Sequence, residues 1–163
     1  MTPEFRSPER MSPERMSPEQ RHRILALTPF TRLSEGWETL GIQVGHRRVR
    51  GPETGMAMVR GRMGGSGNLF NLGEMTLTRV SVALDDDTPG GGALGHGWVA
   101  GRECEHAELI ALIDACARQQ RWARHIDSEL IKPLSQTLAA EHAENSREAA
   151  ATRVDFFTMV RGE

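Results

Sequence analysis

Residues 104–117 read CEHAELIALIDACA, and this stretch decides the fold that we predict. Its apolar side chains cover most of the circumference of a helix that we expect to run from about Glu103 to Arg121. They are Ala107, Leu109, Ile110, Leu112, Ile113, Ala115, Cys116 and Ala117. A helix that is apolar on so many sides is buried by more than one neighbour. We therefore expect a central core helix packed on a sheet; the alternative is that a partner subunit covers one of its faces.

The chain before this helix has an alternating pattern, which is typical of β-strands. The expected strands begin at Ile42, at about 57, at about 74 and at about 96. We expect the first two to be antiparallel and joined by a turn at residues 51–53, which read Gly-Pro-Glu. The third changes phase between Leu77 and Val80, which predicts a bulge near Arg79. An exposed loop at 85–92 leads to the fourth.

Helical patterns flank the sheet on both sides. Residues 17–20, Ser-Pro-Glu-Gln, match a helix start with a capping box. A second short helix follows from Phe30, and another begins at Lys132 and continues to about Ala151. The expected fold class is α+β, a mostly antiparallel four- or five-stranded sheet with N-terminal and C-terminal helices packed on it. The β-prone run at 153–161 either completes the sheet or docks on another chain.

The chain is 163 residues long, which suits one domain. Residues 6–20 read RSPERMSPERMSPEQ, a proline-containing repeat with almost nothing apolar to bury. We expect residues 1–16 to be a disordered tail and 17–163 to be a single domain. Met11 and Met16 lie within the repeat and offer alternative starts of translation.

Composition excludes several classes of protein. The formal net charge of −2 argues against a nucleic-acid-binding protein. No stretch approaches the roughly 18 apolar residues of a membrane span, and the N-terminus lacks the apolar segment of a secretory signal. Cys104 and Cys116 are twelve residues apart in one helical segment, too far for a disulfide. We expect a cytoplasmic protein with reduced thiols, without nucleic-acid or membrane partners.

An arginine and glycine segment is the candidate anion-binding site. Arg60 and Arg62 share one face of a strand and lead into a turn with Gly64, Gly65 and Gly67. Guanidinium groups bind phosphate oxygens, and turn amides form a nest for anions. The alternative is a hairpin turn with solvated arginines. The segment is not a P-loop, because the GK[ST] ending is missing.

No complete catalytic or metal site is recognisable. Cys104 and His106 match no zinc spacing, and they point about 200° apart on a helix, so we predict no metal ligands here. His106 and Glu108 instead suit a hydrogen-bonded pair at a subunit contact, or less well an acid and base. From the residues alone, an interaction subunit and a small anion-binding domain both remain open.

Several strings together resemble the G subunit family of carbon–phosphorus lyase, from about residue 17 to the C-terminus. They are RMGGSG (62–67), TLTR (76–79), GR (101–102), HAE (106–108), ALIDA (111–115) and TRVDFFTMVRG (152–162). The last is the most distinctive. The Ser-Pro-Glu-Arg repeat and the length of the 85–92 loop lie outside the resemblance.

The resemblance implies an accessory subunit of the carbon–phosphorus lyase core complex, with the H, I and J subunits as partners and I in closest contact. With H, I and the L protein, such a subunit supports displacement of adenine from ATP by a phosphonate, a transferase reaction that it does not perform alone. Iron–sulfur and S-adenosylmethionine chemistry belong to the J subunit, and no cofactor is expected on this chain alone.

From the residues and the resemblance together we predict two sets of site residues and no catalytic residue. Arg60, Arg62 and the glycine turn approach the triphosphate. The core helix and the terminal run form the interface, through His106, Glu108, Ile110, Ile113, Phe156, Phe157 and Met159. The alternative is a stand-alone small nucleotide- or phosphate-binding protein.

Overall fold

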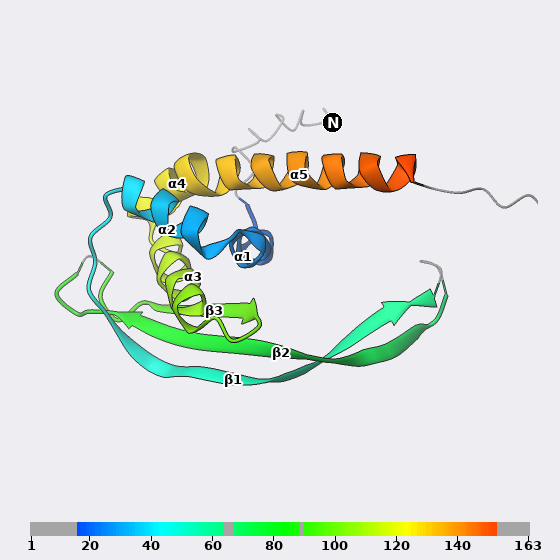
Figure 1. Cartoon of the computed structure of the whole chain (residues 1–163). Helices are drawn as coiled ribbons and strands as arrows, with labels where there is room; N and C mark the ends of the chain where they lie inside the picture. The colour runs from blue at the N-terminus through cyan, green and yellow to red at the C-terminus, as the bar shows by residue number, and fades with distance from the viewer. Residues whose placement is uncertain (1–15, 64–66, 89, 153–163) are drawn as a thin grey trace, which may run out of the picture.

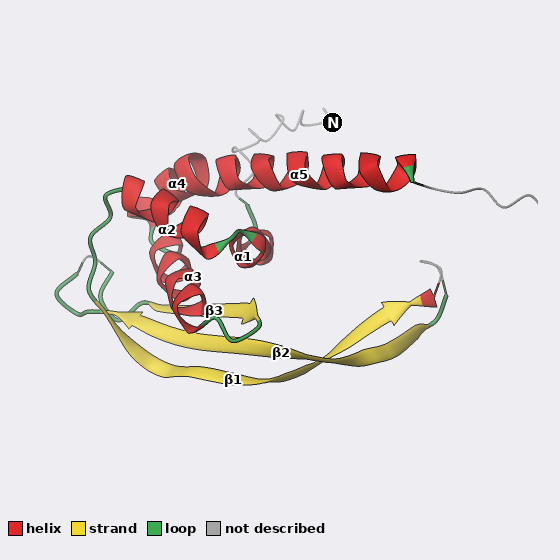
Figure 2. Ribbon diagram, in the orientation of Figure 1, coloured by secondary structure: helices red, strands yellow, loops and turns green. Residues whose placement is uncertain are grey.

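The computed structural model describes residues 16–63, 67–88 and 90–152. The elements in order are α1 (Pro18–Leu27), α2 (Phe30–Thr39), β1 (His46–Arg62), β2 (Leu69–Leu84), β3 (Leu94–Ala100), α3 (Cys104–Ala117), α4 (Gln120–Ile126), the π-helical segment η2 (Asp127–Ile131) and α5 (Lys132–Ala151). Figure 1 shows the helices gathered on one side of a curved sheet, and Figure 2 separates the two layers by colour. The predicted α+β class is confirmed.

The sheet within the described residues has three antiparallel strands in the order β1-β2-β3. The expected count of four or five strands is not confirmed, for two reasons. Residues 42–45 carry no strand pairing. Residues 51–53 do not form a turn, because β1 continues through them and shifts its register against β2. Gly51 has a φ of +79°, and a Cβ there would lie 2.7 Å from the Arg79 carbonyl oxygen.

The bulge predicted near Arg79 lies on the opposite strand. Thr78, Val80, Val82 and Leu84 of β2 are all buried, so β2 keeps its alternation through this region. The additional residues are on β1, where Arg50 pairs with Ser81 but Glu53 pairs with Arg79. The phase change in the sequence arises because Thr78, a polar residue, occupies the core face and Leu77 the other face.

Helix α3 is the central core helix that the sequence predicts. Ten of its residues are buried, from His106 through Ala117 apart from Glu108 and Leu109. It lies directly on β3, where a Cβ at Gly97 would be 1.8 Å from the Ala107 carbonyl oxygen and a Cβ at Gly95 would be 2.0 Å from that of Ala111. Only glycine permits so close an approach of helix and strand backbones.

A buried carboxylate on α3 completes this contact. Asp114 is 7% exposed, and its Oδ2 accepts hydrogen bonds from the His96 backbone N–H at 3.1 Å and from the Arg118 guanidinium at 2.8 and 3.0 Å. The side chain therefore satisfies a donor on the strand that lies directly under the helix. A polar group buried in this way stabilises the fold because its hydrogen-bonding capacity is used.

The predicted helix boundaries are partly confirmed. Ser17 and Gln20 form the expected capping box at the start of α1, with both hydrogen bonds at 3.2 Å. Helix α3 ends at Ala117 rather than near Arg121. Helix α5 has the expected bounds, Lys132–Ala151, and it continues directly from α4 and η2. Pro133 has no N–H for the residue four positions back, which explains why the backbone adopts a π-helical turn just before it.

The remaining predictions on chain organisation lie outside the described residues. They are the disordered repeat tail, of which 1–15 are not described, and the terminal run at 153–163. No helix in the described part of the chain is long and apolar enough to cross a membrane.

Gly97→Ala is expected to lower the free energy of unfolding by at least about 3 kcal/mol, because the new methyl group overlaps the backbone of α3. The control is Gly55→Ala on β1, where a Cβ meets nothing within 4 Å; its effect is expected to stay within about 0.5 kcal/mol. Urea unfolding followed by circular dichroism measures both. Equal stability of the two variants would show that α3 and β3 are not packed this closely.

Candidate functional site

The basic residues at the start of β1 are bound by a carboxylate from α3. The Arg48 guanidinium donates to both carboxylate oxygens of Glu108, at 2.9 and 2.7 Å, and His46 Nε2 lies 3.2 Å from Glu108 Oε1. The Arg48 hydrogen bond holds the pKa of Glu108 below its usual value, against the opposing effect of partial burial. The same bond raises the pKa of Arg48. Glu108 therefore ties β1 to α3.

A second carboxylate, Glu53, forms ion pairs with the next two arginines along the sheet. Glu53 accepts hydrogen bonds from Arg50 at 3.0 Å and from Arg79 at 2.9 Å, and these bonds lower the pKa of Glu53. The Arg79 guanidinium also lies 5.7 Å from the ring centroid of Trp98. Glu53, Arg79 and Trp98 line a shallow hollow of about 350 Å³. Two carboxylates thus compensate part of the positive charge that Arg48, Arg50 and Arg79 bring to this surface.

Arg60 and Arg62 lie at the other end of β1, near the tip of the β1–β2 hairpin. Both are exposed, and the Arg62 guanidinium donates to the Gly67 carbonyl oxygen at 3.0 Å. The structure therefore brings Arg62 and Gly67 together, whereas Gly64 and Gly65 lie outside the described residues. The anion nest that these glycines would form stays a prediction.

His106 is a core histidine. It is 5% exposed, its Nε2 lies 3.1 Å from the Leu25 carbonyl oxygen, and its ring is 5.9 Å from that of Phe30. It therefore does not pair with Glu108, which contacts Arg48 and His46. Ile110 and Ile113 are completely buried in the same core. Any effect of these three side chains on an interface would be indirect, through the position of α3. Phe156, Phe157 and Met159 lie outside the described residues.

The cysteines lie in different environments. Cys104 is exposed, whereas Cys116 is buried, and burial raises the pKa of its thiol to about 12. The Cys116 thiol therefore stays protonated at physiological pH. Within residues 16–63, 67–88 and 90–152, no three His, Cys, Asp or Glu side chains are close enough to hold a metal ion.

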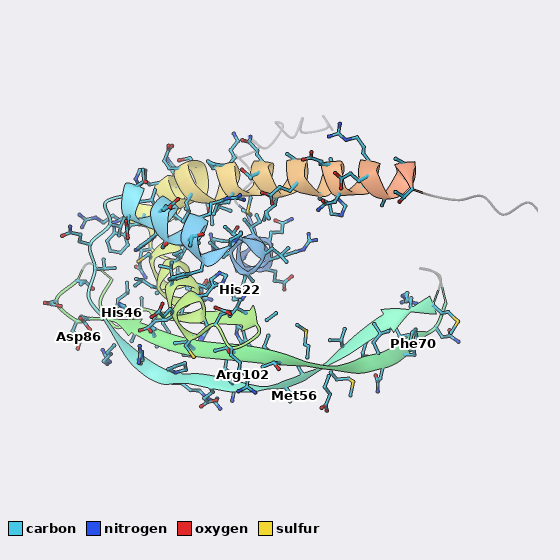
Figure 3. The ribbon with its side chains drawn as sticks, in the orientation of Figure 1. His22, His46, Met56, Phe70, Asp86 and Arg102 are labelled. Atoms are coloured by element: carbon cyan, nitrogen blue, oxygen red, sulfur yellow. The ribbon has the colours of Figure 1, made fainter. Side chains whose placement is uncertain are left out.

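A groove of about 280 Å³ separates α2 from α3 and the start of β1. Its floor is apolar and its rim is polar; the lining includes Phe30, Trp37, Leu109, Leu112, His46, Glu105 and Glu108. Figure 3 places His46 at this end of the sheet. Glu108 already bonds to Arg48 and His46, so this carboxylate of the groove has a structural role.

The feature that sequence reasoning missed is the outer half of the β1–β2 hairpin. Residues 55–63 and 67–75, which we call the arm, contain seven of the eleven large apolar side chains that are exposed among the described residues. Figure 3 labels Met56 and Phe70 on it. The alternation of Ala57, Val59 and Met63 with Met58, Arg60 and Arg62 identified a strand. No local signal shows that, among the described residues, neither a helix nor a third strand covers it.

Comparisons with known proteins place this chain in a family. The family described as "Phosphonate metabolism protein PhnG" matches residues 17–162. The protein named alpha-D-ribose 1-methylphosphonate 5-triphosphate synthase subunit PhnG, from Rhizobium meliloti (strain 1021), is 41% identical over 141 residues, which cover 86% of each chain. The chain belongs to the PhnG family. The PhnG match includes the arm, α3 and all but the last residue of the terminal run, so the resemblance seen in the sequence strings is confirmed.

Glu108→Gln is expected to destabilise the protein at neutral pH and to matter less in acid. The pKa of Glu108 is lowered in the folded state, so its stabilising effect is fully present above the usual carboxyl pKa of 4.5 and is lost as pH falls below it. The gap in melting temperature between wild type and variant should therefore close between about pH 6 and pH 3. Glu105→Gln, on the same helix but outside the Arg48 contact, controls for loss of charge. A gap that stays constant with pH would contradict the pairing.

Proposed function

We propose that this chain is an accessory subunit of alpha-D-ribose 1-methylphosphonate 5-triphosphate synthase in the breakdown of organic phosphonates. The observation that carries the proposal is the 41% identity to a protein named as a subunit of that synthase, over 86% of both chains. A match of this length spans the core helix and the arm together. The similarity therefore extends over the whole fold and is not limited to one shared motif.

The physical structure supports a subunit that does not act alone. The conspicuous carboxylates of the described residues have structural partners: Glu108 binds Arg48, Glu53 binds Arg50 and Arg79, and Asp114 binds Arg118. The large exposed apolar area of the arm is unusual for a protein that works as a monomer. Both features are expected when other chains supply the catalytic groups and cover the apolar surface of the arm.

In the proposed reaction, a phosphonate oxygen bonds to the ribose carbon of ATP that carries adenine, and adenine leaves. The H and I subunits and the L protein act with this chain, and I makes the closest contact. The J subunit cleaves the carbon–phosphorus bond later, with its own iron–sulfur and S-adenosylmethionine chemistry. ATP is thus a substrate of the assembly, which works in the cytoplasm.

Adenine release from ATP and methylphosphonate tests this function directly. The H, I and L proteins are expected to release adenine when this chain is present and to lose most of that activity when it is omitted. Tagged chain co-expressed with H, I and J should also recover them in fixed ratio. An undiminished reaction without the chain would refute the accessory role. A well-behaved monomer that ignores those proteins and binds ATP would favour the stand-alone nucleotide-binding alternative.

The role of Arg60 and Arg62 is a separate part of the proposal. Both guanidinium groups are exposed and suit the oxygens of a triphosphate. Arg60→Ala with Arg62→Ala is expected to raise the KM for ATP at least about tenfold, because a hydrogen bond to a charged group contributes about 1.5–3 kcal/mol. Arg124→Ala with Arg147→Ala removes the same charge from α4 and α5 and should leave KM unchanged. An unchanged KM in the first variant would exclude the anion role.

A further inference from the structure

The arm is a two-stranded ribbon that no other element of the described part of the chain covers. β3 pairs with residues 77–83 of β2 and stops there, while β1 pairs with β2 along its whole length and with no other described strand. Figure 1 shows the outer half of the hairpin extending beyond the end of β3. The arm therefore has open backbone donors and acceptors on both edges. Isolated two-stranded ribbons are marginally stable in water, so an arm of this length needs cover from elsewhere.

Apolar side chains are concentrated on the arm. Those exposed are Met56, Met58, Met63, Leu69, Phe70, Leu72 and Met75, and Met63 is the most open at 74%. Four of the eight methionines of the chain are among them. Met56 and Met58 lie on one face of the ribbon, and Met75 and Phe70, opposite Ala57 and Gly61, lie on the other. Exposed apolar side chains gathered on one element mark protein interaction sites, and methionine adapts its shape to the surface it meets. This composition suits insertion into an apolar groove of another protein.

The end of the arm has a different character. Arg60, Arg62 and Glu74 are its charged residues, which gives the arm a net positive charge on a chain whose overall charge is −2. Neither arginine lines one of the two hollows described above. An anion bound by guanidinium groups in open water is held weakly, because solvent and salt screen the attraction. A triphosphate site that uses Arg60 and Arg62 therefore needs walls that the described part of this chain does not provide at the tip.

One arrangement accounts for both the exposed apolar side chains of the arm and the exposed arginines at its tip. We propose that the arm inserts into an apolar groove of a different subunit, the one that binds the polyphosphate substrate, and carries Arg60 and Arg62 into that subunit's anion site. The inference rests on the proposed function, which supplies the substrate and the assembly. The methionines and Leu72 provide the binding surface, and the guanidinium groups complete the site once water is excluded. The charge of the tip matches an anionic ligand, whereas two overlapping tips of identical copies would repel each other.

Two kinds of variant separate docking from substrate binding. Adenine release is measured while the concentration of this chain is increased at fixed amounts of the other subunits. Met56→Glu with Met58→Glu should require at least about tenfold more chain for half-maximal rate, with the rate at saturation restored. Arg60→Ala with Arg62→Ala should half-saturate at the wild-type concentration and retain its raised KM for ATP. Equal half-saturation of the Met variant and wild type would overturn the docking role.

Controls keep this result interpretable. Leu27→Glu places the same charge on an apolar residue of α1 that is 58% exposed and lies outside the arm, and it should half-saturate as wild type does. The same weakening by Leu27→Glu would overturn the assignment to the arm. Met56→Ala with Met58→Ala adds no charge and should give a smaller shift in the same direction, and the melting temperatures of all variants should match because these side chains are exposed.

A crosslink identifies what covers the arm. A photoreactive phenylalanine derivative replaces Met58 in the assembled complex, and mass spectrometry identifies the product after illumination. A crosslink to a different subunit near its nucleotide site is the expected result. A crosslink to a second copy of this chain, or to residues 153–163 of the same chain, would overturn the proposal. In either case adenine release would still depend on this chain, so the proposed function is tested separately from the docking of the arm.

Discussion

The close approach of α3 to two glycines of β3 is the contact on which the rest of the structure depends. Gly95 and Gly97 leave no room for a side chain above them, so the backbone of α3 lies against the strand at Ala107 and Ala111. This position places the apolar circumference of α3 between the sheet and the surrounding helices, where Ile110 and Ile113 are fully buried. The contact with α3 occupies the whole of β3, which is seven residues long, whereas β1 and β2 are 17 and 16 residues long. The two longer strands therefore extend past the covered part of the sheet.

Two carboxylates of α3 hold the helix against the sheet, one by bonding to β3 and the other by bonding to β1. Asp114 accepts the free backbone N–H of β3, and Glu108 receives the guanidinium of Arg48 from β1. The Arg48 bond lowers the pKa of Glu108 and holds its carboxylate in one orientation, so Glu108 has a structural role. Part of the positive charge close to the core is compensated in this way. At the tip of the arm, Arg60 and Arg62 have no equivalent ion pair among the described residues. The paired arginines near the core therefore stabilise the fold, whereas the two at the tip are available to bind a ligand.

Local sequence patterns predicted the individual helices and strands better than the contacts between them. All-round apolarity identified α3 as a core helix, and the capping box at Ser17 fixed the start of α1, because both depend on neighbouring residues. The Gly-Pro-Glu sequence at 51–53 predicted a turn, but pairing with β2 overrides this preference and absorbs the additional residues as a bulge. The bond between Arg48 and Glu108 joins residues 60 apart, and no periodicity shows it. Exposure of the arm was equally hidden, since a strand pattern does not show what covers the strand.

The pairing of β1 with β2 makes the arm a prepared binding element. Cross-strand pairing runs from Gly55 opposite Leu77 to Arg62 opposite Leu69, so the two strands are already paired within the single chain. Ordering a flexible segment at the moment of binding would consume much of the interaction free energy, whereas a preformed ribbon loses mainly side-chain freedom. The flexible methionines keep that part adaptable. The arm continues from the part of β2 that pairs with β3 beneath α3, and this anchorage constrains where its terminal arginines lie. That constraint is what a subunit needs if it is to place charge inside another protein while its own core stays unchanged.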